Sequence, residues 1–211
     1  MMRFLLLLTF MVTQTALNAQ TSSYIFVFLH KKNNAAEIAK DSLERLMKGH
    51  MANIERLANE KKLLAAGPFD GGGGIFILNT TSKDEAEKWL STDPGVQANR
   101  WDIEILPYSP QIGSVCTVNE PYEMVTYDFL RFNEPSVKTG KALAEHRRLI
   151  KEESENGNVI TLGEFQSAGH ILILKGGAMA KFLESNPAVQ QGILKPEKKK
   201  LWIAKGSFCE K

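Results

Sequence analysis

The sequence is poor in the residues that metal sites and nucleic-acid-binding surfaces require. It contains two cysteines and four histidines in 211 residues, and no cluster of His, Cys, Asp and Glu has the spacing of metal ligands. Lysine and arginine number 26 against 24 aspartate and glutamate residues, a formal net charge of +2. A nucleic-acid-binding domain normally carries a concentrated basic surface. We therefore expect neither a metal ion nor a nucleic acid as a partner.

The sequence also lacks the signatures of phosphate binding and of covalent catalysis. The four glycines from Gly71 to Gly74 are not followed by Gly-Lys-Ser/Thr, so they predict a flexible hairpin turn rather than a phosphate loop. No nucleophile stands at a recognisable strand-to-helix elbow. We expect no cofactor, and we expect proton transfer rather than hydrolysis through a covalent intermediate.

Long apolar runs are confined to the first twenty residues. Arg3 gives a positive start, Phe4 to Val12 is apolar apart from Thr9, and the segment ends in the small residue Ala19. This order is typical of a secretory signal peptide and is too short to span a bilayer stably, although a buried N-terminal strand is the alternative. We expect residues 1–20 to be a signal peptide, the protein to be secreted or periplasmic, and no later segment to span a membrane.

The remaining chain contains one pattern twice. The first copy reads His50, then Gly67-Pro68-Phe69, then Ile75-Phe76-Ile77-Leu78; the second reads His146, then Gly163-Glu164-Phe165, then Ile171-Leu172-Ile173-Leu174. Both copies separate the histidine from the glycine by 17 positions and the glycine from the isoleucine by 8. Asp93-Pro94 of the first copy becomes Asn186-Pro187 in the second. The chain therefore reads as a tandem duplication in which only the first histidine keeps a carboxylate.

Each copy predicts the order strand, helix, strand, strand, helix, strand, which is the ferredoxin-like βαββαβ motif. In the first copy the predicted elements are 24–29, 35–60, 62–69, 74–79, 82–90 and 101–107; in the second they are 122–131, 137–156, 158–165, 170–175, 179–184 and 200–205. We expect one domain over residues 21–108, a linker over 109–120 and a second, degenerate domain over 121–211. Each four-stranded sheet would leave one face bare, so we expect the two sheets to pack face to face as an internal pseudo-dimer. Further homo-oligomerisation stays open.

The two cysteines flank the second copy. In an exported protein they can either form a disulfide or stay as two free thiols. In the βαββαβ motif the last strand runs antiparallel beside the first. Cys116 precedes the first strand of the second copy and Cys209 follows its last strand, so the topology favours a bridge between them.

The first copy resembles the YCII-related domain in three places: the run from His50 to Leu57, the run from Lys62 to Phe69, and Asp93-Pro94. The resemblance covers most of residues 24–108 and, more weakly, 122–205. It implies an α+β fold of the dimeric α+β barrel type, shared with muconolactone isomerase-like proteins, and a His–Asp catalytic dyad in a cleft. One relative resembles a dehydrochlorinase that acts on chlorinated hydroxyquinones. In the second copy Glu164 and Asn186 depart from the pattern.

The candidate catalytic residues are therefore His50 and Asp93. A carboxylate beside an imidazole fixes the tautomer of the ring and keeps its titration near working pH, as general acid/base catalysis requires. The leading hypothesis is a lyase or isomerase acting on a small aromatic or cyclic molecule. The alternative is a non-catalytic ligand-binding or self-associating module, in which His50 is a hydrogen-bonded core residue and Asp93 caps a turn. His30 and His170 are isolated in the sequence.

Overall fold

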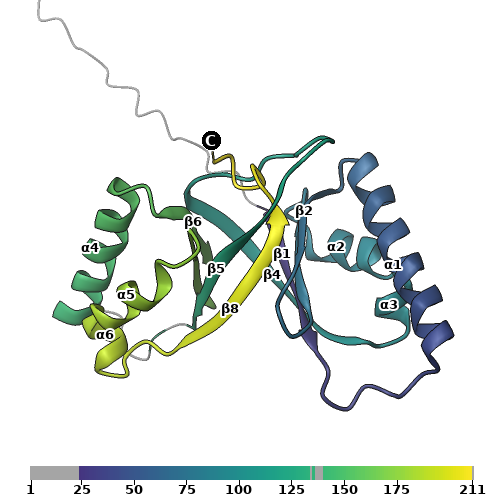
Figure 1. Cartoon of the computed structure of the whole chain (residues 1–211), viewed down its shortest axis with the longest axis horizontal. Coiled ribbons are helices and arrows are strands. Elements are labelled where there is room, and N and C mark those ends of the chain that lie inside the picture. The colour runs from purple at the N-terminus through teal and green to yellow at the C-terminus, as the bar shows by residue number, and fades with distance from the viewer. Residues whose placement is uncertain (1–23, 134, 136–139, 211) are drawn as a thin grey trace, which may run out of the picture.

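The computed structural model describes residues 24–133, 135 and 140–210. The predicted signal peptide lies outside these residues. The fold is of the mixed α+β class, and the order β-α-β-β-α-α-β occurs twice along the chain (Figure 1). The first set consists of β1 (Tyr24–Lys31), α1 (Lys40–Asn59), β2 (Leu63–Pro68), β3 (Gly74–Leu78), α2 (Lys83–Leu90), α3 (Pro94–Gln97) and β4 (Trp101–Ile112). The second consists of β5 (Met124–Phe132), α4 (Lys141–Glu155), β6 (Val159–Phe165), β7 (Gly169–Leu174), α5 (Met179–Glu184), α6 (Pro187–Gln190) and β8 (Pro196–Ala204). No helix in the described part of the chain is long and apolar enough to cross a membrane.

The strands form one antiparallel sheet of eight, in the order β2-β3-β1-β4-β6-β7-β5-β8. Two separate sheets were expected, and they are joined because β4 runs beyond the predicted end at Pro107 to Ile112 and pairs with β6. Pro110 does not end the strand, because the pairing register shifts between Pro110 and Ile112, and such an irregularity accommodates a missing amide. At the opposite ends of the sheet, a single bridge between Phe69 and Leu201 brings β2 beside β8.

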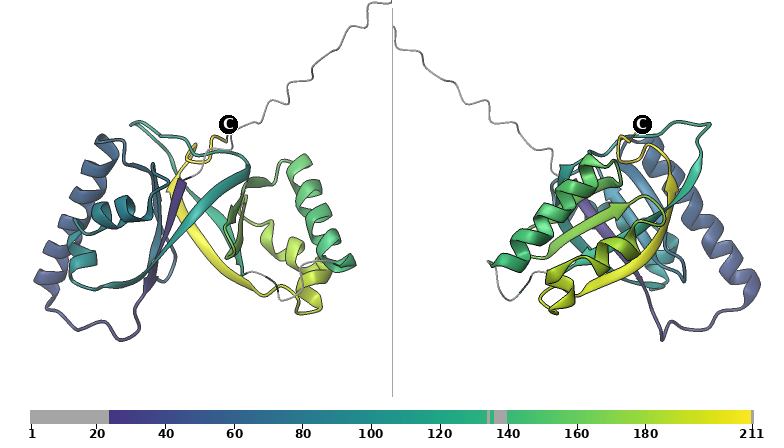
Figure 2. Two further views of the ribbon diagram at one scale, coloured as in Figure 1. Left: turned by 180° about the vertical axis from the view of Figure 1, so that it is seen from behind. Right: turned by 60° about the vertical axis from the view of Figure 1, so that its left-hand side comes forward.

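The helices lie on the outer faces of the two halves of the sheet, and the strands lie between them (Figures 1 and 2). The inner faces share one core cluster, which contains Phe26 and Phe28 of β1 together with Phe129 and Ile173 of the second half. Two further clusters lie between the sheet and the helices, one in each half. Alternation along each strand therefore sends one set of side chains to the shared core and the other set to a helix layer.

An ion pair crosses between the halves inside this core. Arg131 of β5 is 7% exposed and donates two hydrogen bonds to the carboxylate of Glu104 on β4, at 2.6 and 2.7 Å. Its guanidinium lies 4.3 Å from the ring centre of Phe28. Hydrogen bonds from Arg131 hold the pKa of Glu104 below its ordinary value despite the opposing effect of burial, and His30 adds a third contact at 3.0 Å. A bidentate pair of this kind fixes the orientation of β4 relative to β5.

A disulfide joins Cys116 and Cys209, whose Cα atoms are 5.2 Å apart across a sequence separation of 93 residues. Next to it, the Cys116 amide donates a hydrogen bond to the carbonyl of Ser207. The bridge that the βαββαβ topology favoured is thus present. It links the segment that enters β5 with the segment that leaves β8.

Removing this disulfide should lower the free energy of unfolding by about 2–5 kcal/mol, because a loop of this length loses much entropy when it is closed in the unfolded chain. We expect the double variant C116S/C209S to unfold at lower urea concentration than the wild-type protein. Adding a reductant should shift the wild-type midpoint to that of the variant and leave the variant unchanged. A fully reduced wild-type protein with an unchanged midpoint would contradict this.

Candidate functional site

His50 and Asp93 meet between helix α1 and the start of helix α3. Their side chains are 8% and 0% exposed, and Nδ1 of His50 lies 2.8 Å from Oδ2 of Asp93. Asp93 is also the N-cap of α3, because its Oδ1 accepts hydrogen bonds from the amides of Gly95 at 2.8 Å and Val96 at 3.3 Å. The sequence left open whether Asp93 caps a turn or pairs with His50. It does both, with one carboxylate oxygen for each task.

The capping role determines which tautomer of His50 is present. Burial alone would raise the pKa of Asp93, but the hydrogen bond and charge of His50 and the amides of Val96 and Gly95 together hold that pKa below its ordinary value. The carboxylate is therefore ionised at neutral pH and can only accept hydrogen bonds. Nδ1 of His50 must carry the proton, which leaves the lone pair on Nε2. Among the described residues no hydrogen bond to Nε2 is formed.

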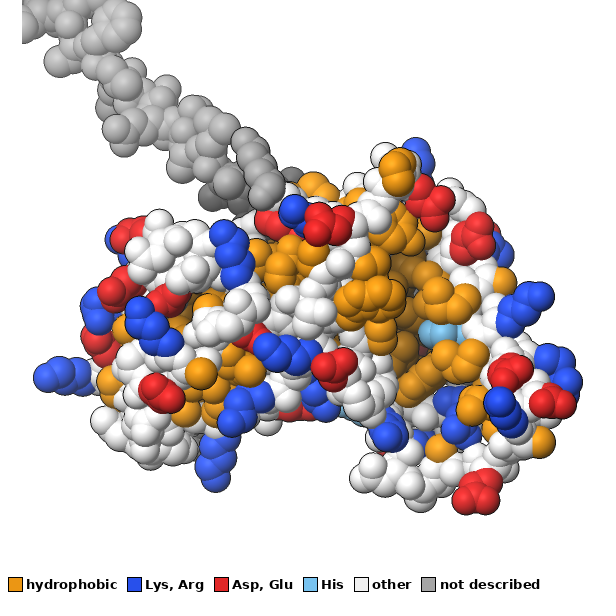
Figure 3. Space-filling model, viewed as in Figure 1, with side chains coloured by type: hydrophobic (Ala, Val, Ile, Leu, Met, Phe, Trp, Pro, Cys, Tyr) orange, Lys and Arg blue, Asp and Glu red, His pale blue; other side chains and the backbone are white. Residues whose placement is uncertain are grey.

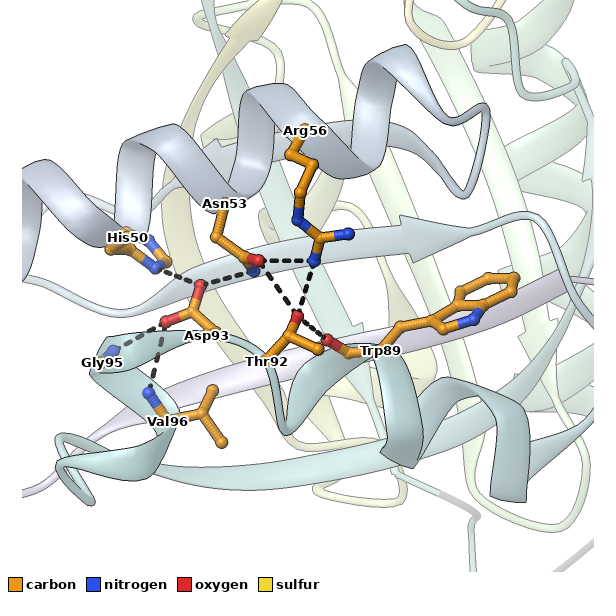
Figure 4. A network of polar contacts seen from close by, with 8 residues as sticks. All are labelled: His50, Asn53, Arg56, Trp89, Thr92, Asp93, Gly95 and Val96. Atoms are coloured by element: carbon orange, nitrogen blue, oxygen red, sulfur yellow. Dashed lines mark hydrogen bonds and ion pairs between the residues drawn. The ribbon is translucent and has the colours of Figure 1, made fainter.

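A polar network on α1 holds the carboxylate in place (Figure 4). Asn53 lies one turn after His50, and its Nδ2 donates to Oδ2 of Asp93 at 3.2 Å. Arg56 donates to Oδ1 of Asn53 and to the hydroxyl of Thr92, each at 2.8 Å. Because Arg56 occupies the amide oxygen, the amide nitrogen of Asn53 is turned toward the carboxylate. Neither Asn53 nor Arg56 was predicted as a site residue, although their spacing from His50 places all three on one face of the helix.

The His50 ring packs against two aromatic side chains. Its centre lies 4.8 Å from that of Trp101 and 6.0 Å from that of Phe76. Trp101 in turn covers Gly95 so closely that a Cβ atom at that position would lie 2.4 Å from the indole. A glycine is therefore required after Pro94 for Trp101 to reach His50. In the second half Ala188 takes the place of Gly95, and Leu194 takes the place of Trp101.

The half that contains α1 has an apolar hollow. Figure 3 shows a histidine side chain at the bottom of this hollow, surrounded by hydrophobic side chains. Two of the exposed large hydrophobic residues of the described chain, Met47 and Met51, lie on α1 within one turn of His50 and are 36% and 59% exposed. Exposed apolar residues gathered around a concave site are typical of ligand pockets.

The second half has an amide where the first has a carboxylate. Asn186 caps α6 through its Oδ1, which accepts from the Ala188 amide at 3.2 Å, so its Nδ2 faces Nδ1 of His146 at 2.7 Å. An amide nitrogen can only donate, so Nδ1 of His146 accepts and the ring proton lies on Nε2. That nitrogen lies 3.1 Å from Nε2 of His170. The tautomer of His146 is thus the reverse of that of His50.

Both histidines of this second pair are uncharged at neutral pH. Burial lowers the pKa of His146 to about 4, and the positive charge of Arg147 makes a smaller contribution in the same direction. Burial and the neighbouring His146 lower the pKa of His170 to about 3. His170 looked isolated in the sequence because its partner lies 24 residues away on a helix. The structure likewise brings the isolated His30 to Glu104.

Residues 25–109 match the family model of the YCII-related domain. No curated protein matches the chain. Among solved structures, a protein assigned as a monooxygenase from Fusobacterium nucleatum subsp. nucleatum aligns over 87% of this chain and 92% of its own, at 11% identity and a TM-score of 0.46. The siroheme decarboxylase NirDL aligns over 87% of this chain and 71% of its own, at 11% identity and a TM-score of 0.42. The same enzyme in complex with an iron-uroporphyrin III analogue gives 8% identity and a TM-score of 0.42, over 87% and 70% of the two chains.

The pair of His146 and His170 should make the protein less stable in mild acid. A histidine whose folded pKa is depressed stabilises the fold fully above its unfolded pKa of about 6.5, and this stabilisation is lost as the pH falls toward the folded value. We expect the free energy of unfolding to fall by up to about 5 kcal/mol between pH 7 and pH 4.5, about 2.5 kcal/mol for each histidine. Urea unfolding at several pH values would measure this.

The double variant H146Q/H170L should show a flatter dependence over the same range, and H30Q should behave like the wild-type protein. If H146Q/H170L kept the full wild-type slope, the pair would not be the source of the acid sensitivity.

Proposed function

Because residues 25–109 match the family model of the YCII-related domain, we propose that the N-terminal half is a small-molecule acid/base site. In this site Nε2 of His50 takes a proton from the bound molecule or returns one, and Asp93 holds the ring. The reaction class is lyase or isomerase chemistry on a small aromatic or cyclic substrate. The observation that carries the proposal is the 2.8 Å contact between Nδ1 of His50 and a fully buried carboxylate.

The chain's own residues supply the requirements for proton transfer. Asp93 stays ionised, so it stabilises the imidazolium that forms when Nε2 of His50 takes up a proton. Asn53 satisfies the second lone pair of the same carboxylate oxygen, and the cap of α3 satisfies the other oxygen. Both oxygens of the carboxylate are therefore hydrogen-bonded, and its lowered pKa keeps it from taking up the proton. The lone pair on Nε2 is the remaining base.

Exposed apolar side chains near this half of the sheet support an apolar substrate. Met47 and Met51 lie on α1 within one turn of His50. The bridge between Phe69 and Leu201 brings β8 beside β2, and the residue after Leu201, Trp202, is 49% exposed. Flexible thioethers and an indole offer polarisable surface to a flat ring. Together with the hydrophobic surroundings of the hollow in Figure 3, they favour a small aromatic or cyclic molecule over a sugar or a phosphate ester.

The second half belongs to the same proposal as a diverged copy. We take the repeated spacings of the sequence, with the recurring order of strands and helices, as support for two copies that form a dimeric α+β barrel within one chain. The proposed domains are residues 21–108 and 121–211. A signal peptide over residues 1–20 would make the protein secreted or periplasmic.

One observation favours a binding module without turnover as the second candidate. His50 is only 6% exposed, so a substrate must reach a single edge of its ring. In a module that only binds, the ring would donate no proton and would serve as part of the apolar floor. Substitutions of His50, Met47 and Trp202 separate the two candidates.

The test is a screen of small aromatic acids and lactones against the wild-type protein, H50A, D93N and H30A. Loss of a positioned general base typically costs 10²–10⁴-fold in rate, and we expect that loss for H50A. D93N should also lose most activity, because an amide in place of the carboxylate gives His50 the wrong tautomer. H30A removes a histidine from the other side of the sheet and should keep wild-type turnover.

Turnover of the same substrate by H50A at the wild-type rate would refute His50 as the base. Binding without turnover, weakened by M47A and W202A but not by H50A, would instead establish the binding module.

A further inference from the structure

A cavity lies in the C-terminal half, away from His50. Its volume is about 750 Å³, within the range of sites that hold a small organic molecule. Helix α4 forms one wall and the hairpin of β6 and β7 forms another, and the extension of β4 closes a third side. The histidine pair of His146 and His170 is part of its lining.

The lining of this cavity divides into an apolar floor and a polar rim. Leu143, Ile150 and Leu194 supply buried hydrocarbon surface, at 5%, 4% and 2% exposure. The charged residues of the lining are Arg147 and Glu164. In the first half of the chain, Met51 and Pro68 stand at the positions that correspond to Arg147 and Glu164. The rim of the C-terminal cavity is therefore polar where the first half has apolar residues, while its floor is apolar.

The histidine pair restricts what can bind beside it. Nδ1 of His146 is occupied by Asn186, and its Nε2–H is directed at His170. The bond from Asn186 therefore keeps a proton on the nitrogen that a metal ion would need, and among the described residues no group of three or more metal-ligating side chains is present. Because Nε2 of His170 accepts the bond from Nε2 of His146, the proton of His170 lies on Nδ1, and this N–H is the donor that the pair has left for a ligand.

The two charged residues of the lining lie on different walls. Arg147 follows His146 directly on α4, and Glu164 lies on β6, across the β6–β7 ladder from His170. On the α4 wall the charged group is therefore the guanidinium, which favours an anionic group.

We propose that this cavity is a second binding site, which takes a small organic carboxylate. The carboxylate of this ligand binds Arg147 and the free ring N–H of His170, and its hydrocarbon part lies on Leu143, Ile150 and Leu194. Arginine is suited to this role because its planar guanidinium matches a carboxylate with two parallel hydrogen bonds. The site is independent of His50 and needs no reaction at the first site.

The experiment titrates benzoate, 4-hydroxybenzoate and hexanoate into the wild-type protein and follows the NMR signals of His146 and His170. The titration extends to about 10 mM, tenfold above the millimolar dissociation constant that corresponds to about 4 kcal/mol of binding. Benzamide, the uncharged isostere of benzoate, serves as the ligand control. We expect saturable shifts with at least one of the carboxylates and weaker or no shifts with benzamide.

The matched variants are R147Q and R148Q, which remove the same charge from adjacent positions. Arg148 faces solvent and pairs with Glu145 and Glu152 on its own helix, so R148Q should bind like the wild-type protein. R147Q should weaken carboxylate binding at least tenfold. E164Q should leave the affinity unchanged or raise it, and H50A should bind like the wild-type protein.

Three results would overturn the proposal. The first is the absence of saturable shifts with all three carboxylates in the folded wild-type protein. The second is equal weakening by R147Q and R148Q. The third is the opposite sign pattern, in which E164Q weakens binding and R147Q does not, because that pattern belongs to a cationic ligand. H50A should alter only the first site. A failure to bind carboxylates in this cavity would therefore leave the proposed acid/base function untouched, and a failure of the acid/base function would leave this binding site untouched.

Discussion

In each half of the protein, a hydrogen bond with a helix-capping side chain determines which ring nitrogen of a histidine carries the proton. In both halves a short helix begins with a residue whose oxygen accepts from the backbone, which leaves the second terminal atom of that side chain facing an imidazole. When this atom is a carboxylate oxygen, as in Asp93, it accepts a hydrogen bond from the protonated Nδ1 and leaves the lone pair on Nε2. When it is an amide nitrogen, as in Asn186, it donates to Nδ1 and places the proton on Nε2. One functional group thus separates a site with an available base from a site with a fixed donor.

The surroundings of the two histidines have diverged in a manner that fits this difference. Asp93 is supported by Asn53, which a buried carboxylate needs because each oxygen must be hydrogen-bonded. At the corresponding place in the second half Leu149 suffices, because Asn186 carries no charge. Conversely, the second half places His170 where the first has Gly74, and the Nε2 proton of His146 then has an acceptor. Each change at the cap is accompanied by a partner that satisfies its new hydrogen-bonding needs.

Hydrophobic periodicity and spacing predicted much of the fold. Where the structure differs from the prediction, the cause is local. Over the described residues the pattern of alternating and helical residues predicted each strand and long helix, although β8 begins at Pro196 and not at residue 200, and the topology favoured the disulfide. The helix predicted from residue 35 begins only at Lys40, and the carbonyl of Ala36 accepts a hydrogen bond from Arg100 instead of a helical amide. The joining of the two predicted sheets could not be read from single strands. It depends on β4 continuing through Pro110, and on pairs such as Tyr108 with Phe165 that lie far apart in the chain.

The sequence predicted the two principal residues of the candidate site, but not the residues that hydrogen-bond to them. His50 and Asp93 stood out because the repeat placed an aspartate and an asparagine at equivalent positions. Asn53 and Arg56 look like ordinary polar positions on an amphipathic helix, and only three-dimensional contact gives them a role. The contact of His146 with His170 was hidden for the same reason.

The most direct test of this account is the tautomer of His50, read from the nitrogen chemical shifts of the imidazole in the wild-type protein and in D93N at neutral pH. The account predicts a protonated Nδ1 and an unprotonated Nε2 in the wild-type protein, and the reverse in D93N, where the new amide would face His50 as Asn186 faces His146. A folded D93N protein in which His50 keeps its proton on Nδ1 would contradict it, as would a wild-type His50 protonated on Nε2 alone.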